Sequence, residues 1–432
     1  MNERAPLKIN LDELVSAGIL DELKKLEIET YYQKHSKDPQ NKLLVAFSML
    51  GAMLTGLGII LIIAHNWDNF GRAAKTFFAF LPLLVSQSLA VWVFLKRKES
   101  IAWREGVSVF LFFSVGACVA LVSQIYHIAG DPGQFALVWI LLTLPVIYIL
   151  RSSALSLLEI SAITWYAMET GYGVYSAMNA QWYWLLLAAV IPHYRLLETR
   201  EKESLFTFFH GWFLPLSLII SIMAMVGQPN GTALLLVFVF MLSAFRGVSG
   251  LLSRGRKISN GFYALGTVGI FLILIMLSFD FWWSEVLRDF ENTEGFVYTG
   301  EIIFGLIFLA TALFLLYKTR KTLPGKGEQI TDYSFLILLL LYPSVLADYM
   351  LPVIMVNILV IVAGIGVVRR GLEEDNLGTL NFGLLVIASL IISRFFDFEL
   401  SFFTRGVMFI ITGAAFFGAN YSMIKKRRGS ET

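Results

Sequence analysis

Apolar runs separated by short polar stretches make up the chain from residue 43 onward. About 20 apolar residues in a helix are enough to cross the hydrocarbon layer of a membrane. A helix also satisfies its own backbone hydrogen bonds, which lipid cannot do. The pattern therefore predicts an all-α, polytopic integral membrane helical bundle of about fourteen transmembrane helices. The predicted spans lie near residues 43–64, 74–95, 106–128, 134–150, 154–172, 180–194, 206–226, 232–247, 261–281, 297–317, 333–348, 351–368, 379–393 and 403–423.

The first 42 residues have a different character, since they are polar and carry seven Lys/Arg and eight Asp/Glu. The basic start and apolar stretch of a secretory signal are absent, so we expect this segment to be retained. Its apolar residues recur at helical spacing. We expect Gly18 to end a first short helix and Asp21 to cap a second that runs to about Lys34. Residues 1–42 are thus predicted to form a small cytosolic helical hairpin, either a cap on the membrane part or a docking module for a membrane or cytosolic protein.

The basic residues give the chain an orientation. Lys and Arg are retained on the cytoplasmic side of a membrane. Of the 34 Lys and Arg residues, 29 lie in the N-terminal tail and in every second loop after it. The other loops hold only Arg72, Arg288, Arg394 and Arg405. This split predicts that both termini are cytoplasmic. The longest outer loop is then expected at about residues 282–296.

The composition agrees with a membrane location and excludes other classes. Hydrophobic residues make up 57% of the 432 residues and charged residues 15%, whereas soluble domains carry about 25% charged residues. The net charge of +2 gives no reason to expect a nucleic-acid partner, and the single cysteine, Cys118, excludes a disulfide framework. No P-loop, G-x-S-x-G or H-E-x-x-H motif occurs. We therefore expect no cofactor and no metal, and a non-enzymatic role is favoured.

Polar motifs follow the first and third predicted spans on the outer side. Gln124 and His127 are three residues apart and share one helix face, which should point into the bundle because an amide facing lipid lacks partners. We therefore predict one outward-open polar pocket at the outer ends of these spans. An alternative is that these residues cap the helices and anchor them at the lipid headgroups. The residues concerned are His65, Asn66, Trp67, Asp68, Gln124, Tyr126, His127 and Asp131.

The same region resembles a family of bacterial predicted membrane proteins, catalogued as domain of unknown function 2157. The resemblance rests on the helix with Leu11, Leu14 and Gly18, on a glycine-rich first span ending in AHNWD, and on QIYHIAGD followed by Trp139 and Pro145. It covers roughly residues 8–150, and residues 381–413 look like the C-terminal part of related families. The family has no established activity. The resemblance therefore implies a bacterial cytoplasmic membrane protein without implying a mechanism.

Two further charged features lie in or beside predicted spans. Glu159 falls inside the fifth span, where an ionisable residue is costly and usually functional. Arg394, Asp397, Glu399 and Arg405 lie at the outer ends of the last two spans. We interpret them as an ion-pair clasp between two helices, since the acids can neutralise the arginines. An anion clamp for phosphate or carboxylate is the alternative.

These features favour a secondary transporter or flippase-like carrier with an outward-facing polar pocket. One alternative is an outer-leaflet, lipid-modifying intramembrane enzyme that uses the histidines and aspartates of the outer motifs as acid and base. Another is a non-catalytic membrane assembly or envelope component that binds its partner through the hairpin. We divide the chain into the hairpin at 1–42, a four-span unit at 43–150, central spans at 151–330, and C-terminal spans with a basic cytosolic tail at 331–432.

Overall fold

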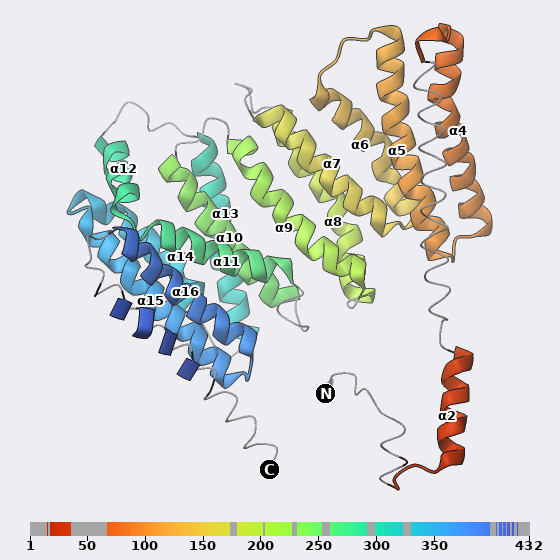
Figure 1. The fold of residues 1–432 in the computed structure, drawn as a ribbon. Helices are drawn as coiled ribbons and strands as arrows, with labels where there is room; N and C mark the ends of the chain where they lie inside the picture. The colour runs from red at the N-terminus through yellow and green to blue at the C-terminus, as the bar shows by residue number, and fades with distance from the viewer. Residues whose placement is uncertain are drawn as a thin grey trace. The chain divides into compact units, whose positions relative to one another are not determined.

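The computed structural model shows an all-α protein (Figure 1). No strand occurs in the residues that the structure describes, which confirms the predicted fold class. Two compact units comprise Met1–Phe77 and Phe78–Thr432. The described residues are 15, 18–35, 67–172, 179–201, 204–226, 231–252, 260–291, 299–322 and 330–397, with single positions between 403 and 421.

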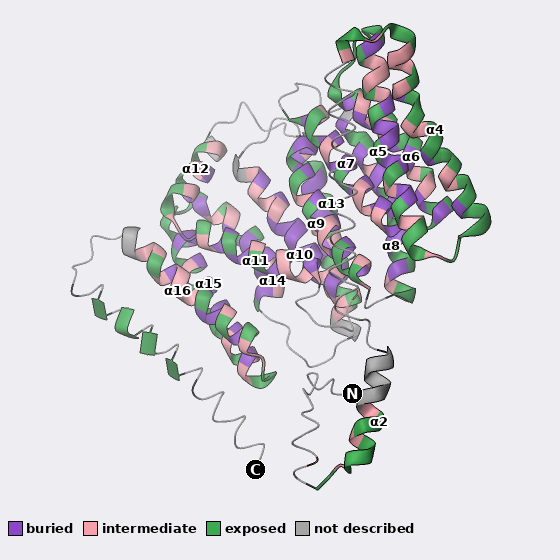
Figure 2. Cartoon of the chain, turned by 45° about the vertical axis from the view of Figure 1, so that its right-hand side comes forward, coloured by how far each residue is buried: buried purple, intermediate pink, exposed green. Residues whose placement is uncertain are grey.

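In the first unit, the second helix of the predicted hairpin is confirmed as α2 (Glu22–His35). Gly18 precedes it with φ of 71°, a left-handed conformation that suits a glycine at the end of a helix. The apolar side chains of Leu23 and Leu26 are exposed, and the described part of α2 is drawn mostly in the colour of exposed residues (Figure 2). The predicted span at 43–64 lies outside the described residues.

The second unit is a series of helices joined by short connections. All predicted spans from 74–95 to 379–393 overlap a described helix. The helices, of which the first begins in the first unit, are α4 (Arg72–Lys96), α5 (Ile101–Tyr126), α6 (Pro132–Leu150), α7 (Ser153–Gly171), α8 (Trp182–Arg200), α9 (Leu205–Val226), α10 (Gly231–Leu252), α11 (Gly261–Met276), α12 (Asp280–Glu291), α13 (Thr299–Thr322), α14 (Ile330–Leu341), α15 (Met350–Glu373) and α16 (Leu377–Asp397). Short 3-10 turns form η1 (Trp67–Asn69), η2 (Asn179–Gln181) and η5 (Tyr342–Leu346).

Eight of the described helices are long and apolar enough to cross a membrane, or nine if the bent pair α11–α12 counts as one span. The eight are α4, α5, α6, α9, α10, α13, α15 and α16. The fourteen predicted spans also included α7, α8 and the shorter α14, which do not meet this standard, and two segments that are not fully described. Helix α7 is less apolar than the other predicted spans because of its position. A helix that is enclosed by other helices has little need of an apolar surface.

Contacts between helices show this enclosure. Helix α7 packs against α5, α6, α8 and α9, and 11 of its 19 residues are buried. Helix α9 also contacts α11 and α13, and so joins the α5–α8 group to the rest of the unit. There α10 packs against α11 and α13, and α15 packs against α16. The main apolar core runs continuously through these helices, from Phe112 on α5 to Leu390 on α16.

The predicted span at 261–281 is not one straight helix, which corrects the sequence interpretation. Helices α11 and α12 meet at 83° across a break at residues 277–279. Residues 280–291 form α12, so most of the predicted outer loop at 282–296 is helical. The side chains of Trp283 and Val286 on α12 are buried, and this amphipathic character explains why the segment reads as polar in sequence.

Candidate functional site

The predicted outer motifs mainly end helices. Asp131 caps α6, because its Oδ1 accepts a hydrogen bond from the backbone N–H of Gln134 at 2.7 Å. His127 ends α5 with φ of 53°, and its Nδ1 lies 2.9 Å from the carbonyl oxygen of Gln124. The side chains of Gln124 and Tyr126 are exposed, and Ile125 is the buried residue of this turn. These contacts are those of helix caps.

The other half of the predicted pocket lies in the first unit. Trp67 and Asp68 belong to η1, and the Lys75 ammonium lies 5.7 Å from the centre of the Trp67 ring. His65 and Asn66 lie outside the described residues. The shared pocket therefore stays a prediction.

Glu159 is the central polar residue of a second, interior site. It is the seventh of the 19 residues of α7 and is fully buried. The hydroxyl of Thr143 on α6 hydrogen-bonds to Glu159 Oε1, and the Trp139 carbonyl oxygen, 2.8 Å away, competes for its single proton. Within the described part of the chain, Glu159 Oε2 is buried and has no hydrogen-bond partner. Because a buried carboxylate with an unmet oxygen is costly, this position favours a protonated carboxyl group or a bound cation.

A buried histidine contacts Ser156, which lies one turn before Glu159 on α7. His210 on α9 is fully buried, and its Nε2 lies 2.9 Å from the hydroxyl of Ser156 on α7. Its Nδ1 lies 2.7 Å from the carbonyl oxygen of Phe206. Ser156 and Glu159 are three residues apart, so they share one side of α7.

The N-terminal end of α7 continues the same line of polar groups. His193 on α8 is buried, and its Nε2 lies 3.2 Å from the Ser153 hydroxyl. Glu105 on α5 accepts hydrogen bonds from the Ser152 hydroxyl at 2.5 Å and from the backbone N–H groups of Ser153 and Ala154 at 2.9 and 2.8 Å. A carboxylate is favourable here because it meets free N–H groups at a helix N-terminus.

We name this arrangement the α7 polar seam. The rings of His193 and His210 have centroids 5.9 Å apart, so two ionisable rings lie side by side within it. The ring of Tyr194 stacks on His210 at 6.1 Å between centroids. Low local dielectric strengthens such buried contacts and makes any unpaired member costly. The seam comprises Glu105, Thr143, Ser152, Ser153, Ser156, Glu159, His193 and His210.

Towards its C-terminal end, α7 is tied to α8 and α9 by hydroxyl groups. Thr164 donates to Ser217 Oγ at 2.7 Å, and the Tyr183 hydroxyl lies 2.9 Å from the same oxygen. All three side chains are buried. Neutral hydroxyls of this kind hold helices together and carry no charge.

The sequence identified Glu159 and missed the rest of the seam. A signal was present, because Ser153, Ser156 and Glu159 recur every third residue in an otherwise apolar stretch. The histidines on α8 and α9 could not be assigned to it, since only packing brings three helices together.

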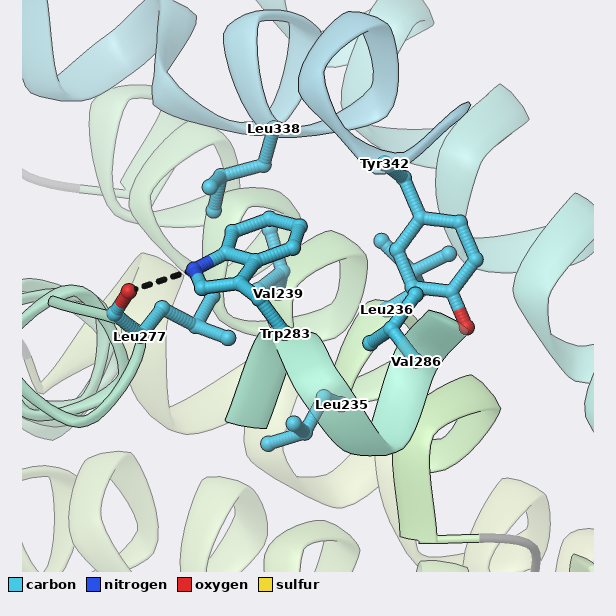
Figure 3. A pocket seen from close by; sticks show the side chains of 8 residues that line it. All are labelled: Leu235, Leu236, Val239, Leu277, Trp283, Val286, Leu338 and Tyr342. Carbon is cyan, nitrogen blue, oxygen red and sulfur yellow. Dashed lines mark hydrogen bonds between the residues drawn. The ribbon is translucent and has the colours of Figure 1, made fainter. Parts of the chain in front are cut away.

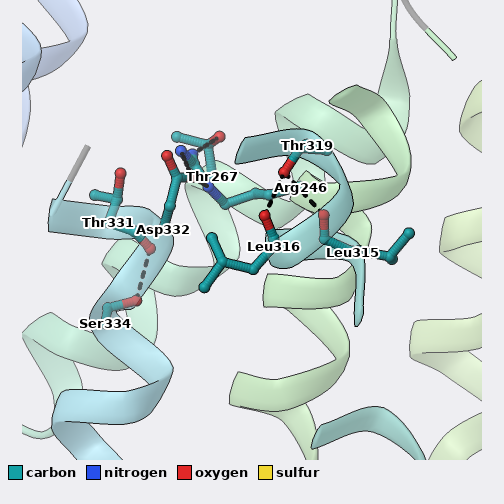
Figure 4. A network of polar contacts seen from close by, with 8 residues as sticks. All are labelled: Arg246, Thr267, Leu315, Leu316, Thr319, Thr331, Asp332 and Ser334. Carbon is teal, nitrogen blue, oxygen red and sulfur yellow. Dashed lines mark hydrogen bonds and ion pairs between the residues drawn. The ribbon is translucent and has the colours of Figure 1, made fainter. Parts of the chain in front are cut away.

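A second buried network lies around Arg246 on α10 (Figure 4). Its guanidinium donates to Asp332 on α14, with Nε at 2.8 Å, and to the Thr267 hydroxyl on α11 at 2.6 Å. The ring of Tyr263 lies 5.5 Å from the guanidinium carbon. Arg246 lies within the predicted span 232–247, and its contacts join three helices.

The break between α11 and α12 is stabilised by two polar residues from α15 and α16. Asn357 donates to the carbonyl oxygen of Ser278 at 3.0 Å, and Arg394 donates to the Ser278 hydroxyl at 3.0 Å. The Arg394 guanidinium also lies 4.2 Å from the centre of the Phe279 ring. The Asn357 contact satisfies a backbone carbonyl group at the break, and the Arg394 contacts hold its side chains.

The predicted clasp around Arg394 stays a prediction. The side chain of Asp397, and the residues Glu399 and Arg405, lie outside the described residues. Among the contacts of Arg394 are those with Ser278 and Phe279 of the break.

Beside the break is an apolar pocket between α10, α12 and α14 (Figure 3). Trp283 fills one side, and its indole N–H donates to the Leu277 carbonyl oxygen at 2.7 Å. The other lining residues are Leu235, Leu236, Val239, Val286, Leu338 and Tyr342. The lining presents no charged group to a ligand.

In the part of the chain that the structure describes, no three His, Cys, Asp or Glu side chains are grouped so that they could hold a metal ion.

Comparison with known proteins gives a partial identification. Neither the curated proteins nor the solved structures that we compared with the chain contain a match. The likeness of residues 381–413 to related families stays a prediction. The matched segment, residues 12–156, is about a third of the chain and ends within α7. It matches the family described as Predicted membrane protein (DUF2157).

Proposed function

We propose that the protein is a secondary carrier whose transport cycle is coupled to protonation of Glu159. The observation that supports this proposal is the buried carboxyl group with one oxygen bonded to Thr143 and the other without a partner in the described residues. A group that is neutral when protonated and charged when not changes the free energy of its surroundings by several kcal/mol. Protonation can therefore shift the balance between two conformations of a bundle.

The discontinuous pair α11–α12 supports a carrier as well. Broken helices recur in secondary transporters, where they are tolerated because protein covers the exposed backbone. Here Asn357 and Arg394 provide that cover. This likeness is one of architecture, and it names no substrate.

The remaining parts of the proposal concern location and access. The charge split supports a bacterial cytoplasmic membrane with both termini inside. We place the substrate entrance at the outer motif around His127, and a protein partner for residues 1–42 remains part of the proposal. The alternative of an outer-leaflet enzyme has less support, because Asp131 and His127 are engaged at helix ends.

The proposal is tested with purified protein in liposomes that enclose the pH dye pyranine. We expect one member of a panel of ions, organic anions and lipid-linked sugars to cause acidification of the lumen, and Glu159→Gln to abolish it. Glu169→Gln is the matched control, since Glu169 is exposed on the same helix. Thr143→Val serves as a second variant, which keeps the Glu159 carboxyl group and removes its hydrogen-bond partner.

Infrared difference spectroscopy supplies a readout that needs no substrate. A protonated carboxyl band should appear as the pH is lowered, should be lost in Glu159→Gln and should persist in Glu169→Gln. Equal spectra and equal transport in both variants would contradict the proposal.

A further inference from the structure

The orientation of the His210 ring follows from its two contacts. The Phe206 carbonyl oxygen can only accept, so the His210 nitrogen beside it, Nδ1, carries the proton and donates. Nε2 of the neutral ring is then an acceptor. The Ser156 hydroxyl, 2.9 Å away, must be the donor to it.

This orientation leaves the oxygen of Ser156 free to accept a proton from another group. Glu159 lies one turn further along the same side of α7, with Cβ atoms about 5–6 Å apart at this spacing. Its Oε2 is the buried oxygen without a partner in the described structure. The two side chains can therefore form a hydrogen bond after a change of rotamer.

We propose that Ser156 and His210 relay protons between Glu159 and the N-terminal end of α7. In this step the O–H bond of the Glu159 carboxyl group breaks and the proton passes to the Ser156 oxygen. The original Ser156 proton passes to His210 Nε2. Glutamate and imidazolium are the products, so atoms and charge balance. The inference rests on the proposed function, because Glu159 is its proton donor.

The seam continues the route beyond His210. The His193 ring is 5.9 Å from the His210 ring between centroids, and His193 contacts the Ser153 hydroxyl. Ser153 also donates its backbone N–H to Glu105. Ser153 lies six residues before Glu159, or about 9 Å along the axis at 1.5 Å per residue. The route therefore leads from Glu159 to the N-terminal end of α7.

The charged groups around the seam favour proton transfer from Glu159 towards the N-terminal end of α7. Helix α5 contributes Glu105 at the N-terminal end of α7, and an acid there stabilises the imidazolium forms. Helix α6 contributes neutral Thr143 and Tyr148, α8 contributes His193, Tyr183 and Tyr194, and α9 contributes His210. Arg151 lies just before α7, which places this end on the proposed cytoplasmic side.

The relay is tested by following the Glu159 carboxyl band after a rapid pH jump, with the protein in nanodiscs of phosphatidylethanolamine and phosphatidylglycerol. We expect Ser156→Ala and His210→Phe to slow the band change by about a hundredfold, as for loss of a positioned proton carrier. The final amplitude of the band should stay unchanged, because the relay sets the rate and not the equilibrium.

Two matched variants act as controls. Ser161→Ala removes an exposed hydroxyl of α7 that bonds only to the Leu157 carbonyl oxygen at 3.0 Å. Ser88→Ala removes an exposed hydroxyl of α4, which bonds to the Leu84 carbonyl oxygen at 2.7 Å. Both should leave the rate unchanged. If His210→Phe fails to fold, the rate of the band change in Ser156→Ala tests the relay by itself.

The outcomes separate the two proposals. A normal Glu159 band with wild-type rates in Ser156→Ala and His210→Phe overturns the relay and leaves the carrier standing. Absence of a Glu159 band in the wild type overturns both.

Discussion

Arg246 on α10 and Asp332 on α14 form a buried ion pair between residues 86 positions apart in sequence. The Arg246 side chain is 5% exposed and that of Asp332 25% exposed. Thr267 accepts a further hydrogen bond from the guanidinium, so α11 is held by the same group. One arginine thus fixes three helices at one end of the second unit.

Replacing Arg246 should destabilise the bundle. Arg246→Ala leaves Asp332 without this cation, and we expect the free energy of unfolding to fall by roughly 2 kcal/mol, below the value for a fully buried pair because Asp332 is partly exposed. Arg246→Lys should recover part of the loss, since it keeps the charge but not the forked geometry. Thermal unfolding of detergent-solubilised protein measures the effect.

The control for this prediction is an ion pair on the surface. Arg288 and Glu285 pair on α12 with side chains 61% and 31% exposed. Arg288→Ala should cost less than about 1 kcal/mol, because exposed ion pairs contribute little. An equal loss of stability in Arg246→Ala and Arg288→Ala would contradict the role that we give to Arg246.

The positions of the helices could be predicted from the sequence because hydropathy acts over a local window. The span prediction at 134–150 and the helix α6 (Pro132–Leu150) differ by two residues at the start. Where helices bury polar groups against each other, hydropathy is a poor guide. Helix α7 carries Ser156 and Glu159 inward, so its sequence is too polar for a lipid-facing span although it sits among such spans.

Of the candidate site, the sequence alone predicted Glu159 and not its partners. Glu159 stands out in the sequence because an ionisable residue inside an apolar span costs free energy and is usually functional. Its neighbours His193 and His210 come from helices that begin 29 and 52 residues after α7 does, and nothing local marks them as partners. The bend at Ser278 was also missed, since it depends on Asn357 and Arg394 from distant helices.

Gly116 on α5 provides a test of close helix packing. A Cβ atom added there would lie 2.5 Å from Cε2 of Trp139 on α6, whose indole N–H is already bonded to the Phe112 carbonyl oxygen. Gly116→Ala should therefore lower stability by about 1–3 kcal/mol through overpacking. On α15, Gly366→Ala meets nothing within 4 Å and should be neutral or stabilising by up to about 1 kcal/mol. Thermal unfolding of both variants decides, and a loss in Gly366→Ala equal to that in Gly116→Ala would contradict the packing argument.

The break between α11 and α12 should depend on Asn357. Its amide donates to the Ser278 carbonyl oxygen, which lies in the break between the two helices. Asn357→Leu leaves that oxygen unmet and should cost about 1–2 kcal/mol. Asn357→Gln tests the geometry, because it keeps the amide and moves it by one methylene. Unfolding midpoints measure the cost, and a Leu variant as stable as the wild type would show that the break needs no such support.

Cysteine labelling tests the orientation of the N-terminal helices. Cys118 is buried and is replaced by Ala to give a clean background. Both His127 and Arg97 are exposed, so a difference between them reports the side of the membrane and not burial. Membrane-impermeant maleimide added outside spheroplasts should label His127→Cys and spare Arg97→Cys. The reverse pattern would overturn the proposed topology.

The same reagent decides whether α7 crosses the membrane. By hydropathy α7 falls short of a span, yet it contains 19 residues, about 28 Å at 1.5 Å per residue, and that is close to the hydrocarbon thickness. Its polar side chains face α6 and α9, so lipid does not meet them. Cysteine at Tyr172, which is 41% exposed at the C-terminal end, should therefore be labelled from outside. Cysteine at Arg151 should be protected until the membrane is permeabilised. If both positions behave alike, α7 does not cross, and Glu159 cannot take part in a proton route across the membrane.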